Sequence, residues 1–334
     1  MEGVVLLIAV ALVFDFVNGW HDSANSIATV VGTKTLTPLQ AVLLAGFGNF
    51  IAILFFELHV AKTIGKGLVV PAVVDQHVIF GALAGAIVWD VITWYFGIPS
   101  SSSHALMGGL AGAALVKAGW GAILVEGWVR PVLFIVLAPL LGLAMGMILM
   151  TLVAWLIFLI EPHAPHGAVR SGGRILQVFS SLSYSVGHGG NDAQKTMGII
   201  TALLVAVGWQ ATYDPPLWVI FSCQAAMALG TVAGGWRIVR TLGTKLCDLK
   251  VPAGISAEAG GAATLFGASM LGIPVSTTHT ITGAIAGAGS VWYRRLSAVQ
   301  WGIVPRIVCA WVLTIPASAA VAAAVYRLSR GISF

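Results

Sequence analysis

Long apolar stretches, separated by short polar connections, run through the whole 334-residue sequence. Hydrophobic residues make up 58% of the chain and charged residues only 9%, whereas about a quarter of an ordinary soluble domain is charged. A helix needs ~20 apolar residues to cross a bilayer. A water-soluble fold is therefore excluded, and we expect an all-α, multi-pass protein of the cell membrane. The stretches cover residues 4–32, 37–57, 78–97, 101–118, 131–160, 174–208, 215–235, 255–272, 276–293 and 303–328.

Several stretches have the wrong length for one straight helix. Residues 4–32 and 174–208 are too long and contain polar residues near their middle, while residues 78–97 and 101–118 nearly touch through Pro99. We therefore expect broken or re-entrant helices, with about ten to twelve membrane segments in all. Because the freed backbone groups of a broken helix need polar partners inside the bilayer, such breaks predict an internal cavity.

One pair of polar motifs occurs twice in the same order. Asp22 of the first motif and His104 of the second are 82 residues apart, and Asp192 and His279 are 87 residues apart. Chance is a poor explanation for this match. The motifs are Gly19-Trp-His-Asp-Ser-Ala-Asn25 and Gly97-Ile-Pro-Ser-Ser-Ser-Ser-His104, then Gly189-Gly-Asn-Asp-Ala-Gln-Lys195 and Gly272-Ile-Pro-Val-Ser-Thr-Thr-His279.

The duplication predicts two repeats, residues 1–160 and 175–334, joined by a short polar connector at residues 161–174. Each half has an odd number of expected crossings, so the second half enters the bilayer from the opposite face. This arrangement is an inverted-topology repeat, in which the substrate site lies near the midplane between the halves. We expect the motif pairs to converge there.

Basic residues are spread over the connections without forming a block, which gives no support to nucleic-acid binding. Placing the N-terminus outside puts ten Lys and Arg on the inner face and six on the outer face. The positive-inside rule then favours external positions for both termini.

Walker, HExxH, GxSxG and CxxC motifs are all absent from the sequence, so we expect neither an enzyme nor a cofactor.

The two Gly-Ile-Pro motifs predict helix starts inside the membrane. The proline ends or opens a helix, and the hydroxyl residues after it cap the next one. A helix start offers unpaired N–H groups and the positive end of the helix dipole, so two starts could enclose a tetrahedral oxyanion. One such run alone would more simply be a helix cap, but two copies favour an anion site. Its hydroxyl donors would be Ser101, Ser102, Ser103, Ser276, Thr277 and Thr278.

The two Asp motifs predict a cation path, because charged residues at membrane depth usually face the bundle interior. The carboxylates of Asp22 and Asp192, together with amide and exposed carbonyl oxygens of their motifs, suit Na⁺, and the same carboxyl groups could instead carry H⁺. Either cation would neutralise the repulsion between Asp and an anion, which gives a physical basis for co-transport. Glu258 lies in an apolar stretch and is a further candidate for this path.

Other polar residues at membrane depth have two interpretations each. Lys195 either contacts Asp192 or the anion, or extends toward an interface. His104 and His279 are expected to pack within the bundle. Asp15, expected near a helix end, and Asp90, without a counterpart in the second half, are less favoured than the aspartates of the two motifs.

The paired motifs resemble those of the inorganic phosphate transporter family, PiT, along nearly the whole chain. The resemblance implies import of inorganic phosphate, or of a neutral metal-phosphate, by symport with H⁺ or Na⁺, and assembly as a homodimer. The short connector resembles that of bacterial low-affinity members. Family roles carried to matching positions place Asn25 and Lys195 beside the hydroxyl donors, and Asn191 with Asp22, Asp192 and Glu258 on the cation path. His21 stands where the second half has Asn191, which favours H⁺ coupling.

Three alternatives remain open. A sulfate permease of the same fold would share most features, although phosphate keeps a proton at neutral pH and can donate it to Asp, whereas sulfate cannot. A membrane-embedded hydrolase would need a nucleophile with an oriented base. A passive channel would show no uphill flux.

Overall fold

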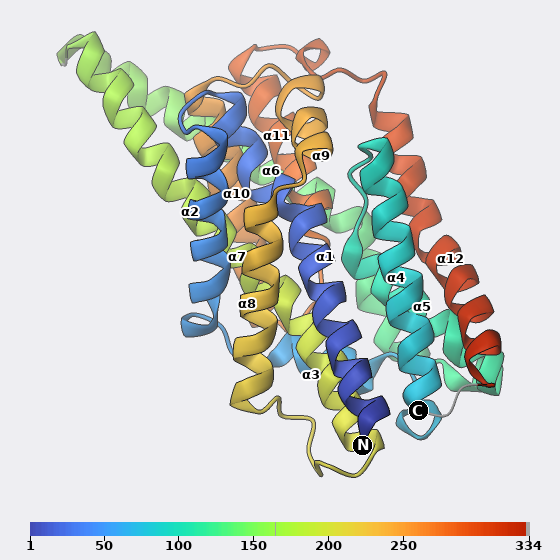
Figure 1. The fold of residues 1–334 in the computed structure, drawn as a ribbon. Coiled ribbons are helices and arrows are strands. Elements are labelled where there is room, and N and C mark those ends of the chain that lie inside the picture. Colours follow the sequence, from blue (N-terminus) through green and yellow to red (C-terminus); the bar gives the residue numbers. More distant parts are fainter. Residues whose placement is uncertain (164, 332–334) are drawn as a thin grey trace.

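The computed structural model describes residues 1–163 and 165–331, and within them the chain is an elongated bundle of twelve α-helices (Figure 1). The first and the last described residues lie at the same end of the bundle (Figure 1). The helices are α1 (Glu2–Gly32), α2 (Pro38–Ile51), α3 (His59–Gly67), α4 (Gln76–Phe96), α5 (Ser102–Ala118), α6 (Val125–Ile160), α7 (His166–Ala206), α8 (Leu217–Ala233), α9 (Trp236–Arg240), α10 (Val251–Met270), α11 (Thr277–Trp292) and α12 (Val304–Ser329).

Four of these helices, α1, α4, α6 and α12, are long and apolar enough to cross a membrane. The number rises to six if the bent pairs α2–α3 and α8–α9, with angles of 83° and 59°, are each one span. This count is below the expected ten to twelve. One reason is that α5 and α11, with 17 and 16 residues, are too short to cross, since they begin inside the bundle. The sequence analysis also missed the short helices α3 and α9.

The predicted breaks at the Gly-Ile-Pro motifs are present. Gly97 ends α4 with φ +64°, and Gly272 follows α10 with φ +66°. Both values lie in the left-handed region that glycine adopts without strain. A new helix then starts at Ser102 and at Thr277. The chain therefore reverses at membrane depth in both halves.

The breaks expected within residues 4–32 and 174–208 are absent, because α1 and α7 continue through both Asp motifs as unbroken helices. Their backbone groups stay paired within the helix, and the polar side chains find partners on neighbouring helices. In addition, α7 begins at His166, so much of the predicted connector belongs to this helix.

The two halves interlock, because helices of one half pack on helices of the other. The first-half hairpin helix α5 packs on α12, its second-half counterpart α11 packs on α6, and α1 packs on α7. Glycines make the close approach possible. A Cβ at Gly108 or Gly112 of α5 would collide with the backbone of α12, and one at Gly283 or Gly287 of α11 would collide with that of α6.

Candidate functional site

The two Gly-Ile-Pro motifs meet inside the bundle. Ser101 and Ser276 are the N-caps of α5 and α11, and their hydroxyls accept the backbone N–H groups of His104 and His279 at 3.2 Å in both cases. The rings of these two histidines contact each other, with centroids 5.0 Å apart. The ring of His279 also stacks on Trp311. The starts of α5 and α11 are therefore neighbours, and both histidines pack as expected.

Lys195 of α7 joins the two motifs. Its side chain is 1% exposed, so it does not extend toward an interface. The ammonium group donates to Ser103 of the first motif and to the Val275 carbonyl oxygen of the second, at 2.9 Å for Val275. It also pairs with Asp192, one turn earlier on the same helix. One buried positive charge thus lies where the two hydroxyl motifs meet.

The two aspartates lie on either side of the α11 start. Asp192 accepts a hydrogen bond from Thr277 at 3.1 Å, and Asp22 accepts one from Thr278 at 3.5 Å. The amide group of Asn25 donates to both threonines, at 3.2 and 2.9 Å. Helices α1, α7 and α11 are therefore joined by one polar network.

Histidines support both carboxylates. His188 Nε2 lies 3.3 Å from Asp192 Oδ2, and His21 Nδ1 lies 2.6 Å from Asp22 Oδ1. Asp22, His188 and Asp192 each place a ligating atom within 4.8 Å of the others, and all three are buried. The sequence analysis did not select either histidine. The signal for His188 was its spacing of four residues before Asp192, which puts both side chains on one face of a helix.

Unpaired oxygens remain around this network. Asn25 uses its amide nitrogen as a donor, and so does Asn191, which binds Ser269 at 2.9 Å and the Ile273 carbonyl at 3.2 Å. The amide oxygens of both asparagines are buried, and the described residues offer them no hydrogen-bond partner. Oxygen atoms beside carboxylates fit a hard cation such as Na⁺. With Asp22 and Asp192 ionised and Lys195 charged, a cation would also balance the remaining negative charge.

Not every predicted residue lies in the central network. Ser101 and Ser276 use their side chains as caps, and the buried hydroxyl of Ser102 has no hydrogen-bond partner within the described residues. Asn191 holds the connection between α10 and α11. The residues that the structure brings together are Asp22, Asn25, Ser103, Asp192, Lys195, Thr277 and Thr278.

Glu258 belongs to a separate buried cluster between α1, α7 and α10. Its carboxylate accepts hydrogen bonds from Thr29 at 2.6 Å, from the amide of Gln177 at 3.2 Å, and from Ser180. Thr29 lies two turns after Asp22 on α1, so the cluster is displaced along that helix by about 10 Å. The three neutral partners were not selected from the sequence. They have no motif, because they come from distant segments of the chain.

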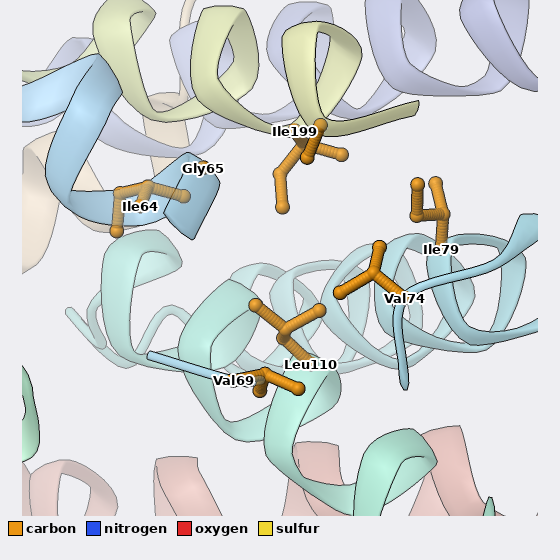
Figure 2. Close-up of a pocket in the computed structure, with 8 residues that line it drawn as sticks. Ile64, Gly65, Val69, Val74, Ile79, Leu110 and Ile199 are labelled. Carbon is orange, nitrogen blue, oxygen red and sulfur yellow. The ribbon is translucent and has the colours of Figure 1, made fainter. Parts of the chain in front are cut away.

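Figure 2 shows a pocket at another place, between α3, α4, α5 and α7. Its labelled side chains are aliphatic and point into the space between these helices (Figure 2). Ile64, Ile79, Leu110 and Ile199 are among them. Such a lining offers no donor to an anion and no ligand to a cation. This pocket is therefore not the candidate site.

Three comparisons with known proteins agree with this geometry. Residues 18–322 match the phosphate transporter family. The chain is 55% identical over 321 residues to a probable low-affinity inorganic phosphate transporter of Rhizobium meliloti, covering 96% of this chain and 94% of that protein. It is 43% identical to a protein of the same description from Bacillus subtilis, covering 96% of each.

A solved structure described as the sodium-dependent phosphate transporter is also similar. It superposes with a TM-score of 0.87 at 26% sequence identity and covers 100% of both chains. The family match includes both Asp motifs and both Gly-Ile-Pro motifs, and the resemblance first seen in those motifs is confirmed. The chain belongs to the phosphate transporter family.

Proposed function

We propose that the protein is a low-affinity secondary transporter that imports inorganic phosphate by symport with Na⁺. The observation that carries the proposal is the meeting of two helix starts, one buried lysine and two buried aspartates in one network. The Rhizobium and Bacillus relatives are described as low-affinity phosphate transporters, and the similar solved structure as sodium-dependent.

Phosphate would bind where α5 and α11 begin. Ser103, Thr277 and Thr278 supply hydroxyl groups there, and the helix starts supply N–H groups and a favourable dipole. Lys195 is the only charged donor in this network, and its ammonium group is already shared between Asp192, Ser103 and Val275. Its attraction for phosphate is therefore moderated. A moderated attraction favours release as well as binding, which transport requires.

Cations would bind along α1 and α7, at Asp22, Asp192, Asn191 and Glu258. A phosphate dianion is repelled by the two aspartates until a cation neutralises them, and this requirement couples the two solutes. In the sequence, His21 stands at the position equivalent to Asn191 of the second half, and this difference favoured H⁺ as the coupling ion. The unpaired amide oxygen of Asn25, in the same network as both aspartates, favours Na⁺ instead, because H⁺ needs no such ligand.

Alternating access would use the two hairpins. The α4–α5 and α10–α11 hairpins are equivalent in sequence and contribute one helix start each to the site. We propose that they belong to inverted repeats, residues 1–160 and 175–334, which rock against each other around the midplane. A homodimer with external termini remains a prediction.

Uptake of ³²P-labelled phosphate into proteoliposomes, with Na⁺ and H⁺ gradients imposed separately, tests the proposal. We expect concentrative uptake with an inward Na⁺ gradient at equal pH, and none with a pH gradient in Na⁺-free buffer. Uptake driven only by the pH gradient would show that the coupling ion is H⁺ and not Na⁺. Uptake that never exceeds equilibrium would indicate a passive channel. Excess unlabelled sulfate tests whether sulfate is a substrate, and omission of Mg²⁺ tests whether a metal-phosphate is the substrate. Neither change should alter the rate of phosphate uptake.

A further inference from the structure

Asp15 is a buried carboxyl group that the proposed function does not use. It lies in the middle of α1, two turns before Asp22, and not near a helix end as expected from the sequence. Its side chain is fully buried, and among the residues that the structure describes neither carboxylate oxygen has a hydrogen-bond partner within 3.5 Å. Burying an isolated ionised carboxylate is strongly unfavourable unless a positive charge compensates it. The position therefore requires a ligand or a proton.

The side chains around Asp15 offer further unpaired oxygens. Asn18, one turn later on α1, and Thr196 of α7 both face the carboxyl group, as does Cys223 of α8. The Asn18 amide oxygen and the Thr196 hydroxyl oxygen are buried, and neither has a hydrogen-bond partner in the described part of the chain. Carboxyl, amide and hydroxyl oxygens from two helices thus lie close to one another. Carboxylate, amide and hydroxyl oxygens are the ligands that hard cations prefer.

The cluster lies on the same seam as the other cation ligands. Asp15, Asp22 and Thr29 are spaced seven residues apart on α1, so they share one face at intervals of about 10 Å. On α7, Thr196 follows Asp192 by one turn. Thr29 belongs to the Glu258 cluster. Asp15 therefore lies on the opposite side of the central network from Glu258.

We propose that Asp15, Asn18 and Thr196 form a binding site for a monovalent alkali cation, Na⁺ in the cell, on the far side of the central network from Glu258. A single carboxylate suits a monovalent ion better than Mg²⁺ or Ca²⁺, which are usually bound by more negative charge. When both are ionised, the carboxylates of Asp15 and Asp192 repel each other. A cation at Asp15 would relieve this repulsion.

Equilibrium binding of ²²Na⁺ to the purified full-length protein, without phosphate, tests this site. We expect Asp15→Asn and Thr196→Val each to remove one bound Na⁺ per chain or to weaken it at least tenfold. Thr196→Val keeps the side-chain shape and no charge changes, so its folding is expected to be intact. The matched control is Asp214→Asn, which removes the same charge from an exposed loop carboxylate paired with Lys62. It should bind Na⁺ like the wild type.

The Asp15 site rests on the proposed function only in that Na⁺ is taken as the coupling ion. The cation site and the Na⁺ symport can therefore be disproved separately. Wild-type Na⁺ stoichiometry and affinity in both Asp15→Asn and Thr196→Val would overturn the Asp15 site, even if uptake is driven by Na⁺. Absence of Na⁺ binding by the wild-type protein, together with H⁺-driven uptake, would overturn both. Loss of one Na⁺ in both variants, with phosphate binding retained in Thr196→Val, supports the site.

Discussion

The two ends of the bundle differ chemically, although the two halves of the sequence correspond. Aligning Asp22 with Asp192 and Gly97 with Gly272 pairs each member of the Glu258 cluster with a residue of the other half. Every partner is aliphatic. Thr29, Gln177, Ser180 and Glu258 correspond to Ile199, Leu7, Val10 and Leu83.

The aliphatic counterparts form a packed region, whereas the Glu258 cluster forms a polar one. Leu7, Leu83 and Ile199 belong to the same buried apolar core, with Val10 against it, and Ile199 also lines the pocket of Figure 2. The two halves therefore have equivalent helices and central motifs. The regions between the central network and the two ends of the bundle are not equivalent. The region around Glu258 offers a carboxylate to a cation, whereas the corresponding positions at the other end, beyond Asp15, are filled by packed aliphatic side chains.

The largest effect is expected in the central network that both ends share. Asp22→Asn should lower Na⁺-driven phosphate uptake about a hundredfold, because losing a buried charged partner costs roughly 3 kcal/mol. Initial ³²P uptake rates in proteoliposomes measure this loss. The control is Asp214→Asn, which should transport normally. Near-normal concentrative uptake by Asp22→Asn would remove Asp22 from the cation path.

A polar side chain at the apolar end tests whether that end is a packed region. Leu83→Gln should destabilise the protein by about 1–3 kcal/mol, because a buried amide without partners is costly. Thermal unfolding in detergent measures the change, and Leu83→Met, which conserves volume, is the control. If Leu83→Gln were as stable as Leu83→Met, this end would be open to water and the contrast between the ends would be wrong.

The complementary change at the polar end should affect Na⁺ and not phosphate. Glu258→Gln removes the negative charge but keeps the shape, so we expect the Na⁺ concentration for half-maximal uptake to rise about tenfold, or ~1.4 kcal/mol. The phosphate KM at saturating Na⁺ should stay the same. An unchanged Na⁺ dependence would make Glu258 a structural residue only.

The smallest effect is expected for one hydroxyl of the anion site. Thr277→Ala should raise the phosphate KM about fivefold, since a hydrogen bond contributes ~1 kcal/mol. Thr282→Ala is the control, because that hydroxyl donates only to the Thr278 carbonyl of its own helix. Equal KM values for the two variants would place the anion elsewhere.

The sequence by itself determined the features that depend on local chemistry. The low charge content required a membrane fold. The helix reversals at Gly97 and Gly272 followed from residue types that end and cap helices wherever they occur. The duplicated motifs identified the residues of the central network, because buried polar side chains stand out in an apolar chain.

Only the tertiary structure decided how the remaining polar residues are used. The length of residues 4–32 and 174–208 and the polar residues near their middle predicted breaks in α1 and α7. Both helices continue instead, because Asn25 and Asp192 find partners on α11. Glu258 lies apart from Asp192 because its partners come from α1 and α7. Such choices depend on which distant side chains meet, and in a bilayer the cost of an unpaired polar group makes that meeting decisive.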